Sequence, residues 1–190
     1  MKKKLLIALL AMFSFANAQK GTILVAGNVG YSSKDDSRGD GLKLNQFNFS
    51  PKVGYQFNDN WTIGGELSYT SVKDRGFDLE SHTKITTIGP FLRYSMPLNQ
   101  TFSVFADLGA GFQNAKQKLD FYNFNNTTDT AQGAYVVITP ALFINMKKGF
   151  GLNFNIGGLG YNTLSYDNYN VNEFNFSFGK GFNFGISKNF

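Results

Sequence analysis

Apolar and polar residues alternate along most of the chain. The clearest stretch is residues 47–57, where Phe47, Phe49, Val53, Tyr55 and Phe57 share one face and polar residues or glycine occupy most positions between them. A period of two is typical of a β-strand with one apolar and one polar face. The same alternation occurs at residues 22–31, 61–69, 87–96, 102–113, 137–145, 150–156 and 174–190. The pattern predicts eight strands and no helix.

The connections between these strands alternate in length. Short turns are predicted at residues 58–60, 97–100 and 147–149, and longer polar loops at residues 33–43, 73–81, 114–132 and 166–172. Short turns on one side and long loops on the other are typical of barrels that cross an outer membrane. The chain holds 21 Phe and 9 Tyr, yet its mean hydropathy is only −0.21. We therefore predict an all-β fold, an eight-stranded antiparallel up-and-down transmembrane β-barrel, with the apolar face toward lipid.

Some positions interrupt this pattern. Lys180 falls on the apolar face of the last strand, where either its side chain extends to the outer interface or a bulge at residues 179–181 shifts the register. A second shift, of one residue, is indicated near Gly157 by Leu159 and Tyr161 beyond it. Pro90 and Pro140 lie on outward faces, where each is expected to leave a gap in a ladder.

The first 18 residues have the features of an export signal. Three lysines precede an apolar run at residues 5–15, and Ala16-Asn17-Ala18 places small residues at the cleavage site. The run is shorter than the roughly 20 residues that a membrane-spanning helix needs. We therefore expect a cleaved signal peptide at residues 1–18 and a barrel at residues 19–190.

Removing the leader changes the charge of the protein. The whole chain carries 18 Lys+Arg against 13 Asp+Glu, and the leader takes three lysines and no acid, which leaves 15 against 13, or +2. No long basic run remains, so no nucleic-acid partner is predicted. The chain has no cysteine and one histidine, which excludes disulfides and thiolate chemistry and predicts neither a metal site nor a cofactor.

Several motifs resemble the outer-membrane protein β-barrel domain family, the OmpA/OmpX-like eight-stranded group of porin-family relatives. They are residues 89–94 (GPFLRY), Thr139-Pro140, residues 183–187 (NFGIS) and the terminal Phe190. The resemblance implies the outer membrane of a Gram-negative bacterium, with its lipid and lipopolysaccharide as partners. It also implies that Phe190 is an assembly signal for the barrel assembly machinery, although Lys188 stands where that signal usually has an apolar residue.

Four charged residues fall on the inner face: Lys52, Glu66, Arg93 and Asp107. The interior of an eight-stranded barrel is just wide enough for side chains to fill, and buried charges must be paired. We therefore expect a salt-bridged plug in the barrel interior. The alternative is a narrow ion path or a catalytic carboxylate pair.

The longest predicted loop carries Phe121, Tyr122 and Phe124 among Asn and Asp residues. Aromatic residues beside adaptable polar ones suit surface contacts, whereas the alternative is a ribbon that extends two strands beyond the membrane. His82, preceded by Ser81 and Glu80, is interpreted as a loop-end histidine.

Taken together, these features predict a non-enzymatic envelope protein with a structural and surface-interaction role, whose surface partner the sequence does not identify. The alternatives are a small porin-like channel, an enzyme that modifies lipid A, and a soluble ligand-binding barrel.

Overall fold

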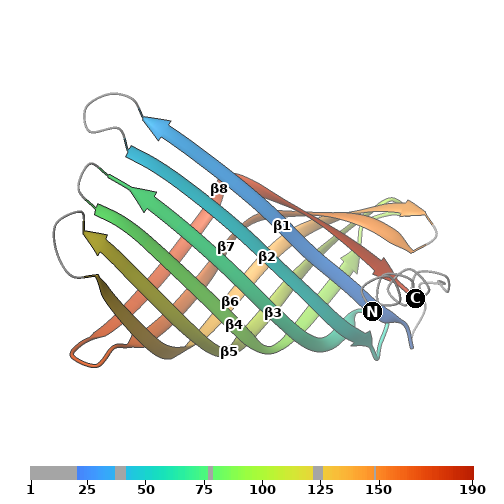
Figure 1. Ribbon diagram of the computed structural model, residues 1–190. Helices are drawn as coiled ribbons and strands as arrows, with labels where there is room; N and C mark the ends of the chain where they lie inside the picture. Colours follow the sequence, from blue (N-terminus) through green and yellow to red (C-terminus); the bar gives the residue numbers. More distant parts are fainter. Residues whose placement is uncertain (1–20, 37–41, 77–78, 122–125, 148) are drawn as a thin grey trace, which may run out of the picture.

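The predicted fold is confirmed. The computed structural model describes residues 21–36, 42–76, 79–121, 126–147 and 149–190. They form eight antiparallel strands that close in chain order into one barrel (Figure 1). The strands are β1 (Ile23–Asp36), β2 (Leu42–Gln56), β3 (Trp61–Arg75), β4 (Leu79–Pro97), β5 (Phe102–Phe121), β6 (Thr127–Lys147), β7 (Phe150–Ser165) and β8 (Asn170–Asn189). Within the described part of the chain, no helix is long and apolar enough to cross a membrane.

The predicted long loops are wrong in extent, because most of their residues belong to strands. β5 and β6 run to Phe121 and from Thr127, which places most of the predicted loop 114–132 in a ribbon. The four long hairpins lie at one end of the barrel and the chain termini at the other (Figure 1). Above a membrane both faces of a ribbon meet water, so the apolar period that reveals a strand in lipid is absent there.

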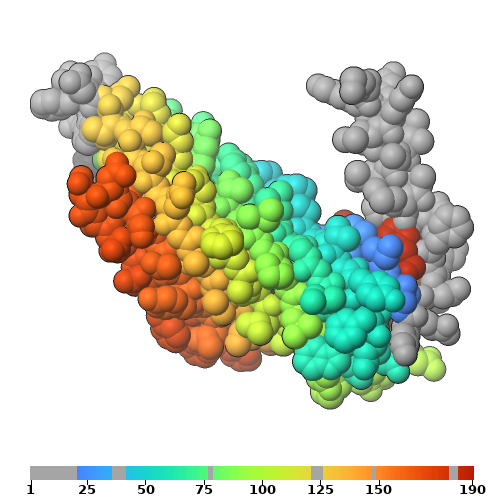
Figure 2. All heavy atoms as spheres, turned by 90° about the horizontal axis from the view of Figure 1, so that it is seen from below, coloured from blue at the N-terminus to red at the C-terminus, as the bar shows by residue number. Residues whose placement is uncertain are grey.

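The outer face of the barrel is apolar and exposed. Phe112 is 75% exposed, Phe176 72% and Ile88 60%. Side chains of successive strands cover the wall in chain order (Figure 2). Soluble monomers rarely expose a continuous apolar surface of this extent. The small buried core lies inside the barrel and contains Leu24, Ala26 and Phe91.

Both expected register shifts are present. In β7 one extra residue lies between the pairs Ile138↔Leu159 and Ala141↔Asn155, which moves the outward positions from even to odd numbers. Against β7, β8 jumps from Phe178↔Gly157 to Asn183↔Asn155, so residues 179–182 bulge opposite a single residue. Gly157 and Gly179 take positive φ values of 133° and 71°, which glycine adopts at little cost. The side chain of Lys180 lies outside the described part of the chain.

Three prolines mark interruptions in the ladders, as the outward positions of Pro90 and Pro140 predicted. The β4–β5 register skips Pro90, and the β6–β7 register skips Pro140. Pro51 lies at a similar gap between β2 and β3. Since proline has no N–H to donate, each ladder loses a bond at a position that faces lipid.

The barrel closes through a short seam between β1 and β8. Their register runs from Leu24↔Asn189 to Asn28↔Gly185, five residue pairs. The β5–β6 register runs from Phe102↔Ile144 to Leu119↔Thr127, eighteen pairs. Beyond Asn28, no strand among the described residues pairs with this edge of β1. The bulge at residues 179–182 lies a few residues beyond the last pair of this seam.

Candidate functional site

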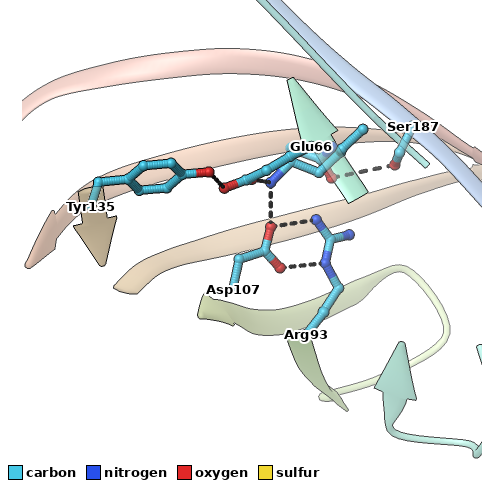
Figure 3. Close-up of polar contacts among 7 residues, drawn as sticks. Glu66, Arg93, Asp107, Tyr135 and Ser187 are labelled. Carbon is cyan, nitrogen blue, oxygen red and sulfur yellow. Dashed lines mark hydrogen bonds and ion pairs between the residues drawn. The ribbon is translucent and has the colours of Figure 1, made fainter. Parts of the chain in front are cut away.

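The four inward charges that the sequence singles out lie together in the barrel interior. Figure 3 shows three of them, Glu66, Arg93 and Asp107. Arg93 binds Asp107 through two nitrogens, with Nε–Oδ1 at 2.6 Å and Nη2–Oδ2 at 2.9 Å. Lys52 Nζ lies 2.8 Å from Asp107 Oδ2 and 3.2 Å from Glu66 Oε2. The Tyr135 hydroxyl donates to Glu66 Oε1 at 3.1 Å. Two cations thus meet two carboxylates, and each carboxylate is held by more than one donor.

Aromatic rings pack against this network. Phe91 is 2% exposed, and its ring lies 4.9 Å from Lys52 Nζ. The Arg93 guanidinium stacks 3.7 Å from the centre of the Phe105 ring. These cation–π contacts add attraction to the ion pairs. The two rings and the ion pairs therefore pack against one another inside the barrel.

The inward-facing residues Gly54 and Gly64 do not leave open space in the interior. A Cβ at Gly54 would lie 3.0 Å from Phe91 Cζ, and one at Gly64 would lie 2.7 Å from Phe91 Cε1. The space beside these glycines is therefore occupied by the Phe91 ring. Their lack of a side chain lets this large ring fit inside a narrow barrel.

A cavity of about 780 Å³ lies between the charge network and the long hairpins. Amide and hydroxyl side chains line much of its wall, among them Gln113, Tyr135, Asn153 and Asn162. Ser187 donates a hydrogen bond to Asn153 Oδ1 at 3.4 Å (Figure 3). The four charged residues of the network also line the cavity, so its wall combines charged, polar and apolar side chains.

Of the three aromatic residues predicted for loop contacts, Phe121 alone falls within a described strand. Tyr122 and Phe124 lie outside the described residues, and Phe121 is the last residue of β5, with a side chain that also lies outside them. The β7–β8 hairpin instead presents a stacked pair, Tyr166 and Tyr169, with ring centres 4.5 Å apart and planes at 11°. Tyr169 is 53% exposed. Partial burial, Tyr169 and Asp129 raise the pKa of the Tyr166 hydroxyl, which keeps that ring neutral.

His82 lies in β4 on the outer face, beyond the lipid-facing belt. Its Nε2 lies 3.1 Å from Ser71 Oγ. The neighbouring residue Ser81 points to the opposite face of the strand. Glu80 pairs with Arg75 at 2.9 Å. Burial and the charges of Lys84, Lys73 and Lys118 lower the pKa of His82. Within the described chain no carboxylate hydrogen-bonds this ring, and its sequence neighbours Ser81 and Glu80 do not form a catalytic triad with it.

The terminus that carries the predicted assembly signal pairs with the start of the barrel. The Phe190 N–H donates to Ile23 O at 2.9 Å, and the Ile23 N–H donates back to Phe190 O at 3.0 Å. The Lys188 ammonium, at the position expected to be apolar, lies 4.5 Å from the Phe150 ring centre and 4.6 Å from that of Phe190. The two rings give this cation favourable contacts at the membrane edge.

Sequence reasoning missed Phe91, Phe105 and Tyr135 as interior residues. A usable signal was present: Phe91 has the parity of Arg93, and Phe105 that of Asp107, so each had to point inward. An aromatic residue in such a strand is easily taken for a lipid contact, because most aromatics of this chain face outward.

Comparisons with known proteins agree with this architecture. A family model described as "outer membrane protein beta-barrel domain" matches residues 5–182. The attachment invasion locus protein Ail of Yersinia pestis has a TM-score of 0.52 at 19% identity, covering 90% of this chain and 100% of that one. The same protein in complex with the heparin analogue sucrose octasulfate gives a TM-score of 0.51 at 20% identity, with the same coverage. The translocator domain of the autotransporter NalP from Neisseria meningitidis gives 0.50 at 12% identity, covering 92% and 64%. No curated protein matches the chain.

Proposed function

Because the chain belongs to the outer membrane protein beta-barrel domain family, we propose that it is a non-enzymatic barrel that makes surface contacts through its outer hairpins. The observation that carries this proposal is the contrast between the interior and the outer end. Ion pairs and rings pack against one another in the interior, whereas long hairpins with exposed side chains project from the end opposite the termini. Such an arrangement supports contact outside the cell more than passage through the wall.

The proposal includes the route to the membrane. Residues 1–18, which lie outside the described part of the chain, act as a cleaved signal, and Phe190 contributes to recognition by the barrel assembly machinery. The mature barrel then lies in the outer membrane of a Gram-negative bacterium, with lipid and lipopolysaccharide around its apolar belt. The contacts of Lys188 with the Phe150 and Phe190 rings are compatible with recognition of the last strand by the assembly machinery.

The interior network is proposed to act as a plug that fixes strand register. Arg93, Asp107 and Lys52 connect β4, β5 and β2, so a slip of one residue in any of these strands would turn a charge toward lipid. A through-channel has less support, because Phe91 and Phe105 occupy the space beside the ion pairs. Catalysis has less support as well, because Glu80, the acid nearest His82 in sequence, is already paired with Arg75.

The Ail complex with sucrose octasulfate suggests a probe for the surface role. Cells that produce this barrel should adhere to heparin-coated beads more strongly than cells that lack it. Replacing residues 120–126 with Asn-Gly would trim the β5–β6 ribbon and keep Lys118. This replacement closes a short hairpin between Leu119 and Thr127, which are cross-strand partners. Adhesion should fall in the trimmed variant.

The control is gel mobility of the outer-membrane fraction, with and without boiling in SDS. A heat-dependent shift in both proteins would show that the trimmed barrel still closes. Equal adhesion of wild type and trimmed variant, with both barrels folded, would contradict contact through this ribbon. Loss of the shift from the wild type would contradict the membrane barrel itself.

A further inference from the structure

A group of basic residues lies on the outer face of three adjacent strands, just beyond the apolar belt. Cross-strand pairing aligns Ser71, Lys84 and Lys116 in one row. The next row outward aligns Lys73, His82 and Lys118. All these positions have the parity of the lipid-facing residues of their strands, so the side chains share one face. We call Lys73, Lys84, Lys116 and Lys118 the lysine patch.

The lysine patch has more positive charge than nearby acids neutralise. Lys118 pairs with Asp120 at 2.7 Å. Among the described residues, no carboxylate lies within ion-pair distance of Lys73, Lys84 or Lys116. Like charges directly opposite one another on a sheet are destabilising. The direct pairing of Lys84 with Lys116 therefore has a cost that an external anion would remove.

The height of the patch above the belt indicates which anion it meets. Ile88 and Phe112 are cross-strand partners with 60% and 75% exposure, and Lys84 and Lys116 each lie four residues further out. At about 3.3 Å per residue and a tilt of about 45°, four residues rise about 9 Å along the membrane normal. The outer surface of these strands faces the viewer in Figure 2. This level corresponds to the polar headgroups that border the hydrocarbon.

We propose that the lysine patch binds phosphate groups on the headgroups of outer-leaflet glycolipids. The inference rests on the proposed partnership with membrane lipid and names the site and the chemical group. Lysine ammonium groups bind phosphate as compact point charges. The patch faces sideways above the belt, where a lipid anchored in the same leaflet reaches it without leaving the membrane.

Native mass spectrometry of the folded barrel in detergent tests this site. The two probes are a diphosphorylated glycolipid and its dephosphorylated form with the same acyl chains. Wild type should retain the phosphorylated probe preferentially. A lysine near a charged lipid surface contributes about fivefold in affinity, so Lys84→Gln with Lys116→Gln should weaken that binding about 30-fold. The matched control, Lys34→Gln with Lys43→Gln, removes two outer-end lysines of the β1–β2 hairpin and should keep the preference.

The lone histidine gives a second measurement. His82 lies between Lys73 and Lys118 in its row, so a bound phosphate should raise its pKa in an NMR titration. The dephosphorylated probe should leave the titration unchanged. Glu80 and Lys84 on the same strand also act on the pKa of His82, and they do so equally in both samples.

Three outcomes would overturn the proposal. These are equal retention of both probes by wild type, an undiminished preference in the patch variant, and displacement of the glycolipid by an equimolar amount of soluble sucrose octasulfate. The last outcome would assign the patch to soluble polyanions. Because heat-dependent mobility verifies folding and bead adhesion tests the hairpins separately, failure of this site is distinguishable from failure of the proposed surface role.

Discussion

At the scale of single residues, the interior depends on charge pairing that is nearly closed to solvent. The Arg93 and Asp107 side chains are each 7% exposed. A buried charge that loses its partner keeps the cost of desolvation and loses the attraction that offset it. The pair is therefore more sensitive to removal of one member than to removal of both.

Arg93→Met should lower the free energy of unfolding by about 3–5 kcal/mol, because Asp107 is then left with Lys52 alone. The double variant with Asp107→Asn should lose less, since Lys52 and Glu66 remain as a neutral pair. Chemical denaturation in detergent micelles measures both. As a control, Arg75→Met breaks an exposed pair and should cost less than about 1 kcal/mol. A double variant less stable than Arg93→Met would argue against the plug.

At the scale of strands, the sequence predicted the elements well wherever one face meets lipid. Period-two alternation located all eight strands, and the parity change beyond Gly157 located a bulge. The extension of β5 and β6 beyond the membrane was predicted only as an alternative to a surface loop, and the ends of the two strands could not be located, because both faces of that ribbon meet water. The inward charges were predictable from parity, whereas their mutual pairing depends on strand register, which a pattern along one strand does not specify.

The close packing of β2 and β3 gives a test at this scale. A Cβ at Gly64 would overlap the carbonyl oxygen of Val53 and come within 2.7 Å of the Phe91 ring, whereas one at Gly65 would meet nothing nearer than 4.0 Å. Gly64→Ala should therefore destabilise the barrel by roughly 1–3 kcal/mol, as overpacking of cores does. Gly65→Ala adds the same methyl group on the outer side and should be near neutral. Equal unfolding midpoints for the two variants would show that the ring adjusts freely.

At the scale of the whole molecule, the barrel is closed by strands of unequal pairing. The β1–β8 seam ends at Asn28, while every other neighbouring pair continues toward the hairpins. Backbone groups of an open edge in lipid lack partners, at several kcal/mol for each unsatisfied group. The wall is therefore least stable along this line.

Hydrogen exchange should resolve the seam residue by residue. The Ile23 N–H points toward β8, so by alternation those of Val29, Tyr31 and Ser33 also point into the seam. Their amides should exchange quickly. Those of Gly30 and Ser32 point toward β2 and should be protected. Uniform protection along β1 would mean that β8 pairs with its whole length.

The short seam also determines how the barrel yields to force. A cylinder held equally at every joint would resist lateral tension by stretching all of its ladders together. Here five residue pairs and the Ile23–Phe190 hydrogen bonds join the two ends of the wall, so tension in the plane of the bilayer concentrates on them. We expect β1 and β8 to separate along the barrel before any pair of strands joined by a hairpin does.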